Sequence, residues 1–390
     1  MIRTGNVPFE FATSGRIVFG LGILQRLGEY LSDFGRRILV VGGKDPSRRR
    51  PLVEQLDRLG IKQIEVEIAG EPTIDVIDRG VRLARSSYVT GVIGFGGGSV
   101  IDSAKAIAAL TTNQGDIADY LEVIGKGKPL ETRAVPLCAI PTTAGTGAEV
   151  TKNAVLGSPA HRVKVSLRSS ILLPRVVLID PETTVPVPPT VTVSTGLDTL
   201  TQLIEPYVSI RANPITDAFC LPGIPRVAQA LPRAFRNGQD RTARSDMSLA
   251  SLLSGMALAN AGLGAVHGFA APIGGMFDAP HGAICAALLP HVMEMNVRAL
   301  RQRMPESEAL RRYDTLGRLL SNKTDAAADD AVKRVRDLCR TLNVSNLGKF
   351  GIRADDIEVL VERAQQANST KANPIALEAD ELAEILKAAL

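Results

Sequence analysis

The sequence has few of the features that indicate nucleic acid binding or export. Aromatic residues make up only 4% of its 390 positions, and the formal net charge is only +4. Long basic blocks and alternation of aromatic with basic residues are missing, which argues against nucleic acid as a partner. The first residues lack the apolar core of a signal peptide, so we expect a cytoplasmic protein.

Cysteine is also scarce. The four cysteines, Cys138, Cys220, Cys285 and Cys339, stand far apart in the chain, without the short spacings of zinc or redox motifs. We therefore predict reduced, mostly buried thiols, as is usual in a cytoplasmic protein.

One segment, from Ser248 to Phe277, contains no Asp, Glu, Lys or Arg. Its Asn260, His267, Pro272 and several glycines make it a poor membrane span. We predict a pair of helices buried inside a domain, and no membrane partner. A histidine in such surroundings is a candidate functional residue.

The chain is long enough for two domains. In its first half, short apolar strands alternate with helical patterns, as in strand Ile38–Val41, helix Ile74–Arg85 and strand Val92–Phe95. A helix is also predicted around Leu24–Leu31. This alternation predicts an α/β domain with a mostly parallel sheet.

The proline-rich connector Val185–Pro189 marks a change of pattern. Beyond it, apolar residues recur at helical spacing to the end of the chain. We therefore predict an α/β domain over residues 1–184 and an all-helical domain over residues 185–390. Because Pro222 and Pro225 interrupt one helical pattern, a break or kink is expected there.

The glycine-rich loop Gly96–Gly98 follows a predicted strand and opens into a helical stretch, Ser103–Ala108. Glycine lets the backbone approach an anion closely, and the free N–H groups of a helix start carry the positive end of the helix dipole. The loop predicts phosphate binding and so a nucleotide-dependent enzyme. The other interpretation, a tight turn without a ligand, stays open at this point.

A second loop, Pro141–Thr151, also follows a predicted strand and contains small hydroxyl residues and glycines. These residue types can donate hydrogen bonds to phosphate or to a nicotinamide amide. The alternative is a surface loop without a ligand.

The helical half contains a candidate metal site. Asp198 and Gln202 stand one helical turn apart, and His267 and His281 follow in later segments. One carboxylate and two neutral imidazoles suit Fe(II) or Zn(II). Spacing alone favours the other interpretation, in which each histidine is a core residue without a ligand.

Taken together, the motifs resemble those of the iron-containing (group III) alcohol dehydrogenases, in the same order and over nearly the whole chain. They are Gly96–Lys105, Pro141–Thr151, Gly196–Asp198, Gly264–His267 and Pro280–Gly282, with Phe19–Gly22 before them and Leu288–His291 after them. The resemblance implies a dinucleotide-binding domain, an all-helical domain, and reversible NAD- or NADP-dependent oxidation of a primary alcohol to an aldehyde. It also implies a homodimer, for which Phe9–Phe19 is a candidate edge-pairing segment.

The resemblance also implies roles for single residues. Gly97, Gly98 and Ser99 would hold the cofactor's pyrophosphate, Asp102 would lie near the nicotinamide, and the cofactor would be lined by Thr142, Thr143, Thr146 and Lys164. Metal binding, and with it catalysis, would fall to Asp198, His267 and His281.

The chain departs from the family at two active-site positions. Gln202 stands where the family has its fourth metal ligand, a histidine, and Ala271 stands where a second histidine takes part in a proton path. An amide oxygen is a weaker ligand than imidazole, so Gln202 is an optional fourth ligand and metal affinity is expected to fall. Alanine cannot relay a proton.

A third departure concerns the choice of cofactor. Gly43 occupies the position after the second strand where NAD-dependent members place an aspartate. Without that carboxylate a 2′-phosphate is not repelled, and Lys44, Arg48 and Arg49 could attract it. We predict that NADP is accepted. A solvated basic loop is the alternative, in which Asp45 restores ribose binding.

The sequence thus predicts an NAD(P)-dependent alcohol dehydrogenase or aldehyde reductase that uses a divalent metal, Fe or Zn. Two alternatives remain. One is a metal-independent reductase of an oxo-acid, or a lyase-type relative, on the same dehydroquinate-synthase-like fold, and the other is a nucleotide-binding protein without turnover. A buried Asp198 beside two histidines favours a cation and weighs against the metal-independent alternative. No motif names the particular alcohol or aldehyde.

Overall fold

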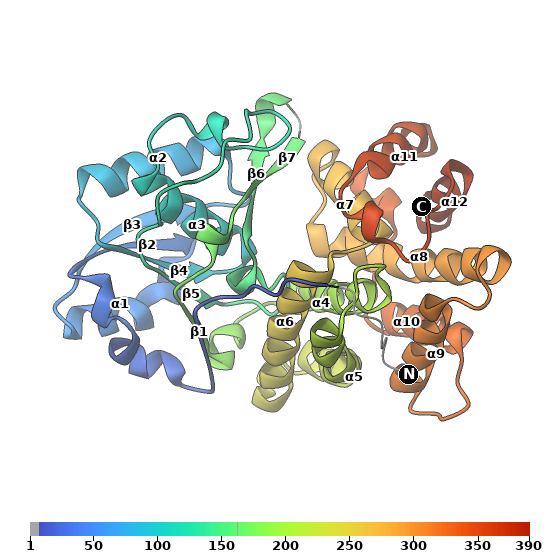
Figure 1. The fold of residues 1–390 in the computed structure, drawn as a ribbon. Helices are drawn as coiled ribbons and strands as arrows, with labels where there is room; N and C mark the ends of the chain where they lie inside the picture. Colours follow the sequence, from blue (N-terminus) through green and yellow to red (C-terminus); the bar gives the residue numbers. More distant parts are fainter. Residues whose placement is uncertain (1–7, 162) are drawn as a thin grey trace. The chain divides into compact units, whose positions relative to one another are not determined.

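The computed structural model describes residues 8–161 and 163–390. It divides into two compact units, one of residues 12–187 and one of residues 188–390 together with the segment up to Phe11 (Figure 1). This division differs from the predicted 1–184 and 185–390 at Val185–Val187 and at the start of the chain. That domain assignment stays a prediction.

The first unit is built on a six-stranded sheet with the order β1-β8-β5-β4-β2-β3. Every pair of neighbouring strands in it is parallel, which confirms the prediction of an α/β fold with a mostly parallel sheet. The strands are β1 (Arg16–Phe19), β2 (Arg37–Gly43), β3 (Lys62–Ile68), β4 (Gly91–Gly96), β5 (Leu137–Pro141) and β8 (Val176–Ile179). An antiparallel hairpin that the sequence pattern did not indicate, β6 (Asn153–Ser158) and β7 (Val163–Arg168), stands apart from this sheet.

Three α-helices connect the strands: α1 (Arg50–Arg58), α2 (Ile74–Ser86) and α3 (Gly98–Thr112). The 3-10 helices of this unit are η1 (Ile23–Tyr30), η2 (Ser32–Phe34), η3 (Pro46–Arg49), η4 (Ile117–Asp119), η5 (Ala148–Val150), η6 (Pro159–His161), η7 (Ser170–Leu172) and η8 (Pro181–Thr184). The helix predicted around Leu24–Leu31 is therefore 3-10 in type, and its backbone leaves helical angles at Arg26. Gly28 lowers the helix propensity of this segment. A larger residue there would require Leu59 to shift, because a Cβ would lie 2.8 Å from Leu59 Cδ2.

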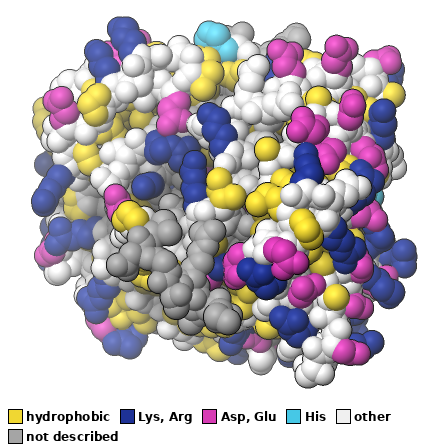
Figure 2. All heavy atoms as spheres, turned by 45° about the vertical axis from the view of Figure 1, so that its right-hand side comes forward, with side chains coloured by type: hydrophobic (Ala, Val, Ile, Leu, Met, Phe, Trp, Pro, Cys, Tyr) yellow, Lys and Arg dark blue, Asp and Glu magenta, His cyan; other side chains and the backbone are white. Residues whose placement is uncertain are grey.

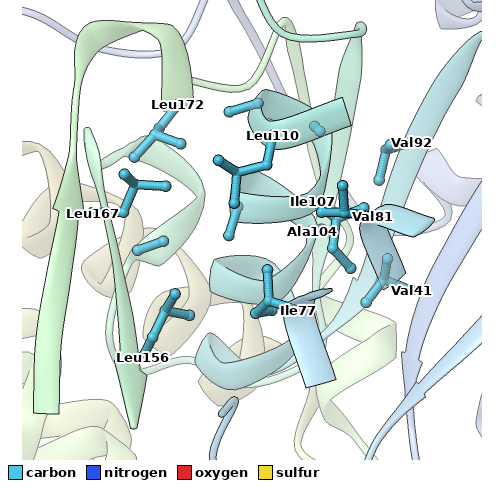
Figure 3. Packing of buried hydrophobic residues seen from close by; sticks show 14 of the residues in the cluster. Val41, Ile77, Val81, Val92, Ala104, Ile107, Leu110, Leu156, Leu167 and Leu172 are labelled. Carbon is cyan, nitrogen blue, oxygen red and sulfur yellow. The ribbon is translucent and has the colours of Figure 1, made fainter. Parts of the chain in front are cut away.

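Strand residues alternate between the two faces of the sheet, and a separate core forms on each face. Leu39 and Val41 of β2 pack with α2 and α3, whereas Ile38 and Val40 pack with η1 and α1. Figure 3 shows the first core, where side chains of β2 and β4 meet those of Ile77, Val81, Ala104, Ile107 and Leu110. Helices on both faces explain why the central strands β4 and β5 are buried throughout.

The second unit is helical, and its described residues form no strand, which confirms the predicted helical C-terminal region. Its α-helices are α4 (Pro189–Val208), α5 (Pro214–Arg236), α6 (Arg241–Ala261), α7 (Ala265–Met276), α8 (His281–Arg303), α9 (Glu308–Ser321), α10 (Ala328–Thr341), α11 (Ile357–Gln366) and α12 (Ala379–Ala389). Its 3-10 helices are η9 (Leu347–Phe350), η10 (Ala354–Asp356) and η11 (Thr370–Ala372). Helix α4 packs against α5, α6 and α8 and is buried from Gly196 to Val208.

The break expected at Pro222 and Pro225 is wrong, because α5 continues through both residues and through Pro232. Each proline removes one backbone hydrogen bond, but α5 is held by its packing against α4 and α6. A capping box at Asn213 also fixes its start. Tertiary packing thus overrides the local preference.

No single helix in the described part of the chain is long and apolar enough to cross a membrane. The charge-free segment forms the end of α6 and all of α7, as the predicted helix pair requires. The two helices are bent by 98° at the break between them.

On the face of the molecule drawn in Figure 2, basic and acidic side chains lie side by side over much of the surface.

Candidate functional site

The glycine loop joins strand β4 to helix α3, as the sequence predicts. Gly97 is the N-cap of α3, and no side chain caps this helix start. The N–H groups of Gly98 and Ser99, the first two residues of α3, have no intrahelical acceptor and are available to an anion.

The second predicted loop lies against the first. Strand β5 pairs with β4, and Thr142 N–H donates a 2.9 Å hydrogen bond to the Gly96 carbonyl. A Cβ added to Gly97 would lie 3.2 Å from Thr143 Oγ1, and one added to Gly98 would lie 2.8 Å from Thr146 Oγ1. The glycines therefore allow the threonine loop to approach, and the structure brings these candidate cofactor residues together.

The carboxylate of Asp102 is held by two neighbours. Its Oδ2 accepts a 3.0 Å hydrogen bond from Val155 N–H, and its Oδ1 lies 3.0 Å from Lys105 Nζ. Burial raises the pKa of the Asp102 carboxyl, and the Lys105 ammonium opposes that rise. The side chain of Asp102 is still 13% exposed, so one part of it can meet a ligand.

Lys105 is a residue of the glycine motif to which the sequence assigned no role. Its fully buried ammonium donates hydrogen bonds to the Ala148 carbonyl (2.7 Å) and to Thr151 Oγ1 (3.0 Å). These contacts tie α3 to the end of the threonine loop. Lys105 therefore positions the loop.

Two other candidate cofactor residues lie elsewhere in the first unit. Lys164, on β7, forms a 3.3 Å ion pair with Glu71. Gly43 ends β2, and a Cβ added to it would meet no atom within 4 Å. The space beside Gly43 is therefore open to part of a ligand.

The basic residues after β2 differ in how free they are. Arg49 is buried, and its guanidinium donates to the Gly43 carbonyl and, at 2.9 Å, to Glu65 Oε2. Lys44 is exposed, and Arg48 is half-buried. Asp45 accepts hydrogen bonds from the N–H and hydroxyl of Ser47, which hold the pKa of its carboxyl below the ordinary value. The charged groups of Lys44 and Arg48 are thus more accessible to a ligand than that of Arg49.

The candidate metal centre lies wholly within the helical unit. Asp198 comes from α4, His267 from α7, and His281 and Cys285 from α8. One side-chain atom of each lies within 4.8 Å of the others. Asp198 Oδ1 is 3.3 Å from His267 Nε2 and 3.8 Å from His281 Nε2. The structure therefore brings together Asp198, His267 and His281, which the sequence predicted as metal ligands, and adds Cys285 to them.

These atoms suit a divalent ion. Asp198 Oδ1 is buried and has no hydrogen-bond donor, which is costly for a carboxylate unless a cation compensates it. Zinc bonds of about 2.0–2.3 Å in a tetrahedron separate ligand atoms by about 3.3–3.7 Å, close to the observed distances. Neutral imidazole and carboxylate are also chemically suitable donors.

Gln202 lies one turn after Asp198 on α4, but its amide has other partners. Its Nε2 donates a 3.0 Å hydrogen bond to Asp198 Oδ2, and its Oε1 accepts one of 3.2 Å from Ser254. A carboxylate only accepts hydrogen bonds, so the amide nitrogen must face Asp198. The amide oxygen consequently faces Ser254.

Glu205, one turn further along buried α4, supports His267. Glu205 Oε2 lies 2.6 Å from His267 Nδ1, and Oε1 accepts a 2.8 Å hydrogen bond from Val266 N–H. A hydrogen on Nδ1 that is shared with Glu205 leaves Nε2 with its lone pair toward Asp198. Such a carboxylate–histidine pair is the usual outer support of a metal ligand.

The ionisable groups at the centre shift one another's pKa values. Burial alone would raise the pKa of Asp198, but His281 and His267 bring it below the ordinary value. Burial would lower the pKa of both histidines, but the neighbouring thiol and carboxylate groups raise it. A bound cation would replace the protons that otherwise balance this negative charge.

Sequence reasoning missed both Glu205 and Cys285. Glu205 follows Gln202 on the buried face of a helix, where an acidic residue is a recognisable signal. Cys285 follows His281 by one turn, and only the packing of α7 against α8 shows that it also approaches His267. Ala271, one turn after His267, is exposed.

The comparisons with known proteins agree over both units. Residues 14–181 match the model of the family "Iron-containing alcohol dehydrogenase", and residues 192–390 match that of the "Fe-containing alcohol dehydrogenase family, C-terminal". The chain is 34% identical to alcohol dehydrogenase 4 of Saccharomyces cerevisiae over 382 residues, which cover 95% of this chain and 96% of that protein.

Two further matches also cover nearly the whole chain. An NAD-dependent methanol dehydrogenase of Bacillus methanolicus is 32% identical over 381 residues, with 96% of this chain and 97% of that protein covered. The crystal structure of a 1,3-propanediol oxidoreductase superposes with a TM-score of 0.90 at 29% identity, with 98% of this chain and 100% of that chain covered. The chain belongs to the iron-containing alcohol dehydrogenase family and is an oxidoreductase of the alcohol dehydrogenase class.

Proposed function

We propose that this enzyme interconverts a primary alcohol and its aldehyde by metal-assisted hydride transfer with NAD or NADP. One observation carries the proposal. Asp198 Oδ1 is buried without a hydrogen-bond donor and lies near the Nε2 atoms of two histidines. An oxygen in that state calls for a cation, which neither a metal-independent reductase nor a nucleotide-binding protein without turnover requires.

The chain's own residues have separable tasks in this reaction. In alcohol oxidation the substrate loses a hydride to the oxidised cofactor and a proton to solvent or the cofactor ribose. A divalent ion, held by Asp198, His267 and His281, would supply Lewis-acid stabilisation of the alkoxide. Glu205 would keep His267 in the ligating tautomer. Since Ala271 cannot carry a proton, the family's usual proton path is absent from α7.

The cofactor is assigned to the first unit. The uncapped N-terminus of α3, at Gly97, Gly98 and Ser99, suits a pyrophosphate. Candidate residues that line the cofactor are Thr142, Thr143, Thr146, Asp102 and Lys164. Lys164 would exchange its ion pair with Glu71 for a ribose contact.

We further propose that NADP is accepted alongside NAD. The open space at Gly43 carries no carboxylate that would repel a 2′-phosphate. Exposed Lys44 and half-buried Arg48 are the available cations, whereas Arg49 is already paired with Glu65. Asp45 Oδ1 already accepts two hydrogen bonds from Ser47, which favours this proposal over ribose binding by Asp45.

A homodimer in the cytoplasm is the proposed form of the enzyme. Strand β1 lies at the edge of the sheet, paired only with β8 within the described sheet. Its last residue, Phe19, has 37% of its surface exposed. An edge strand with an exposed aromatic residue suits pairing with a second copy.

The test is turnover of straight-chain primary alcohols and aldehydes, with NAD and NADP, by enzyme loaded with Fe(II) or Zn(II). Turnover that chelator removes and either ion restores supports the proposal. Full turnover in chelator, or reduction of oxo-acids alone, would favour the metal-independent alternative. Cofactor binding without any turnover would favour the nucleotide-binding alternative.

A further inference from the structure

Cys285 is the unexpected member of the metal cluster. It follows His281 by one turn of α8, so both side chains project from the same side of that helix. Its Sγ lies 3.7 Å from His281 Nε2 and 3.9 Å from His267 Nε2. The residue is completely buried. The thiol therefore faces the same point as the two imidazoles and Asp198 Oδ1.

Gln202, the residue expected as the fourth ligand, forms hydrogen bonds to other groups. The amide nitrogen of Gln202 is committed to Asp198 Oδ2, and the amide oxygen faces Ser254. Gln202 would have to give up both contacts before its oxygen reached the cluster. Cys285 needs no such rearrangement, because its sulfur already lies among the ligand atoms.

We infer that Cys285 is the fourth protein ligand of the metal, and that the resulting Asp–His–His–Cys set selects Zn(II) over Fe(II). Thiolate is a soft donor that favours zinc, whereas a site of imidazole and carboxylate alone is less discriminating. On binding, the sulfur forms a bond to the ion and its proton leaves to solvent. Gln202 then acts on Asp198 rather than on the metal.

This assignment shares its metal site with the proposed function but does not require turnover. Zinc is four-coordinate in closed sites and can expand to five ligands. The proposed function therefore requires that the site leave room for a fifth ligand. If no such position opens, Cys285 still binds the metal, but the alcohol dehydrogenase activity is absent.

The direct test is the optical spectrum of the full-length protein loaded with Co(II), which replaces zinc and gives a thiolate-to-cobalt charge-transfer band in the near ultraviolet. We expect the band in the unaltered protein and its loss in Cys285→Ser. Cys220→Ala is the matched control, since Cys220 is a buried cysteine of the same unit outside the cluster. Gln202→Ala should keep the band. Bound cobalt without the band in the unaltered protein, a band that persists in Cys285→Ser, or no bound cobalt would overturn the assignment.

A competition experiment measures selectivity without any assay of activity. The protein is equilibrated anaerobically with equal Zn(II) and Fe(II), and bound metal is counted by mass spectrometry. Cys285→Ser should lower the ratio of bound zinc to bound iron, because the loss of a soft thiolate donor weakens zinc binding more than iron binding. If Cys285→Ser fails to fold, the band and the preference for zinc in the unaltered protein and in Gln202→Ala decide the question.

Turnover, measured in parallel, separates the two proposals. Alcohol oxidation by cobalt-loaded protein that lacks the band would retain the proposed function and reject Cys285 as a ligand. The band without oxidation of any alcohol would retain Cys285 and reject the proposed function.

Discussion

Glu205 and His267 are joined by a 2.6 Å hydrogen bond between Oε2 and Nδ1, in a part of the helical unit where both side chains are buried. The other oxygen of Glu205 accepts the N–H of Val266, the residue before His267. One carboxylate thus fixes both the backbone and the ring at the start of α7. The orientation of His267 is set by this pair rather than by the metal alone.

Replacing Glu205 by glutamine should weaken metal binding. Glutamine has one oxygen for two donors, so either Val266 N–H or His267 Nδ1 loses its acceptor. We expect metal affinity to fall about 10–100-fold, measured by titration with a competing chelator. Glu294→Gln, which alters an exposed pair with Arg336, is the control and should bind metal normally. Equal affinity in both variants would show that Glu205 does not support a ligand.

Gly98→Ala should impair binding of the dinucleotide. The new Cβ would lie 2.8 Å from Thr146 Oγ1, so the threonine loop must shift. Overpacking of this kind costs about 1–3 kcal/mol, and we expect cofactor affinity to fall about tenfold or more, measured by nicotinamide fluorescence. Gly157→Ala, whose Cβ would meet only an ordinary 3.6 Å contact, should leave affinity unchanged. A loss of the same size in both variants would contradict the prediction.

Gly43→Asp should shift the enzyme toward NAD. The position is open, so the carboxylate fits without displacing a neighbour. It would repel a 2′-phosphate and accept hydrogen bonds from an unphosphorylated ribose. We expect the ratio of kcat/KM for NADP to that for NAD to fall about tenfold or more, equivalent to ~1.4 kcal/mol. An unchanged ratio would place the 2′-position of the cofactor elsewhere.

Glu149 should make stability depend on pH. Burial raises the pKa of its carboxyl to about 7, from an ordinary 4.5. Between these values the folded protein holds a proton that the unfolded chain has released, so stability falls as the pH rises toward 7. The loss is at most about 3.5 kcal/mol, at roughly 1.4 kcal/mol per pKa unit.

Glu149→Gln removes this dependence, because an amide does not titrate. The variant should therefore gain Tm relative to the unaltered protein at pH 8, and the gain should vanish near pH 4.5. Glu131→Gln, at an exposed position, should show neither effect. A variant that is less stable at pH 8 would mean that Glu149 is ionised in the folded protein.

The fold was largely predictable because its signals are local. The strands β2 and β4 are short apolar runs that end in glycine, and the alternation of strand and helix indicates the parallel sheet. The path of α5 was not predictable in this way. Its prolines weaken a helix locally, and only packing against neighbouring helices shows that it continues.

The residues of the candidate site also differ in whether local sequence signals reveal them. Asp198, His267 and His281 stand in motifs that resemble those of a known family, so sequence reasoning reaches them. Cys285 stands in no such motif and was predicted only as a buried thiol. Its closeness to His267 depends on how α7 packs on α8, and no sequence spacing encodes that distance.

The proposed metal ligands also have a consequence for how the helical unit unfolds. They lie on α4, α7 and α8, so an ion held by all of them cross-links distant parts of the chain and closes the long loop between Asp198 and His267. Such a cross-link removes freedom from the unfolded chain, and the chain loses it only when the ion dissociates. The helical unit would then unfold no faster than it releases its metal. A chelator that removes the metal would therefore shorten the lifetime of the folded state.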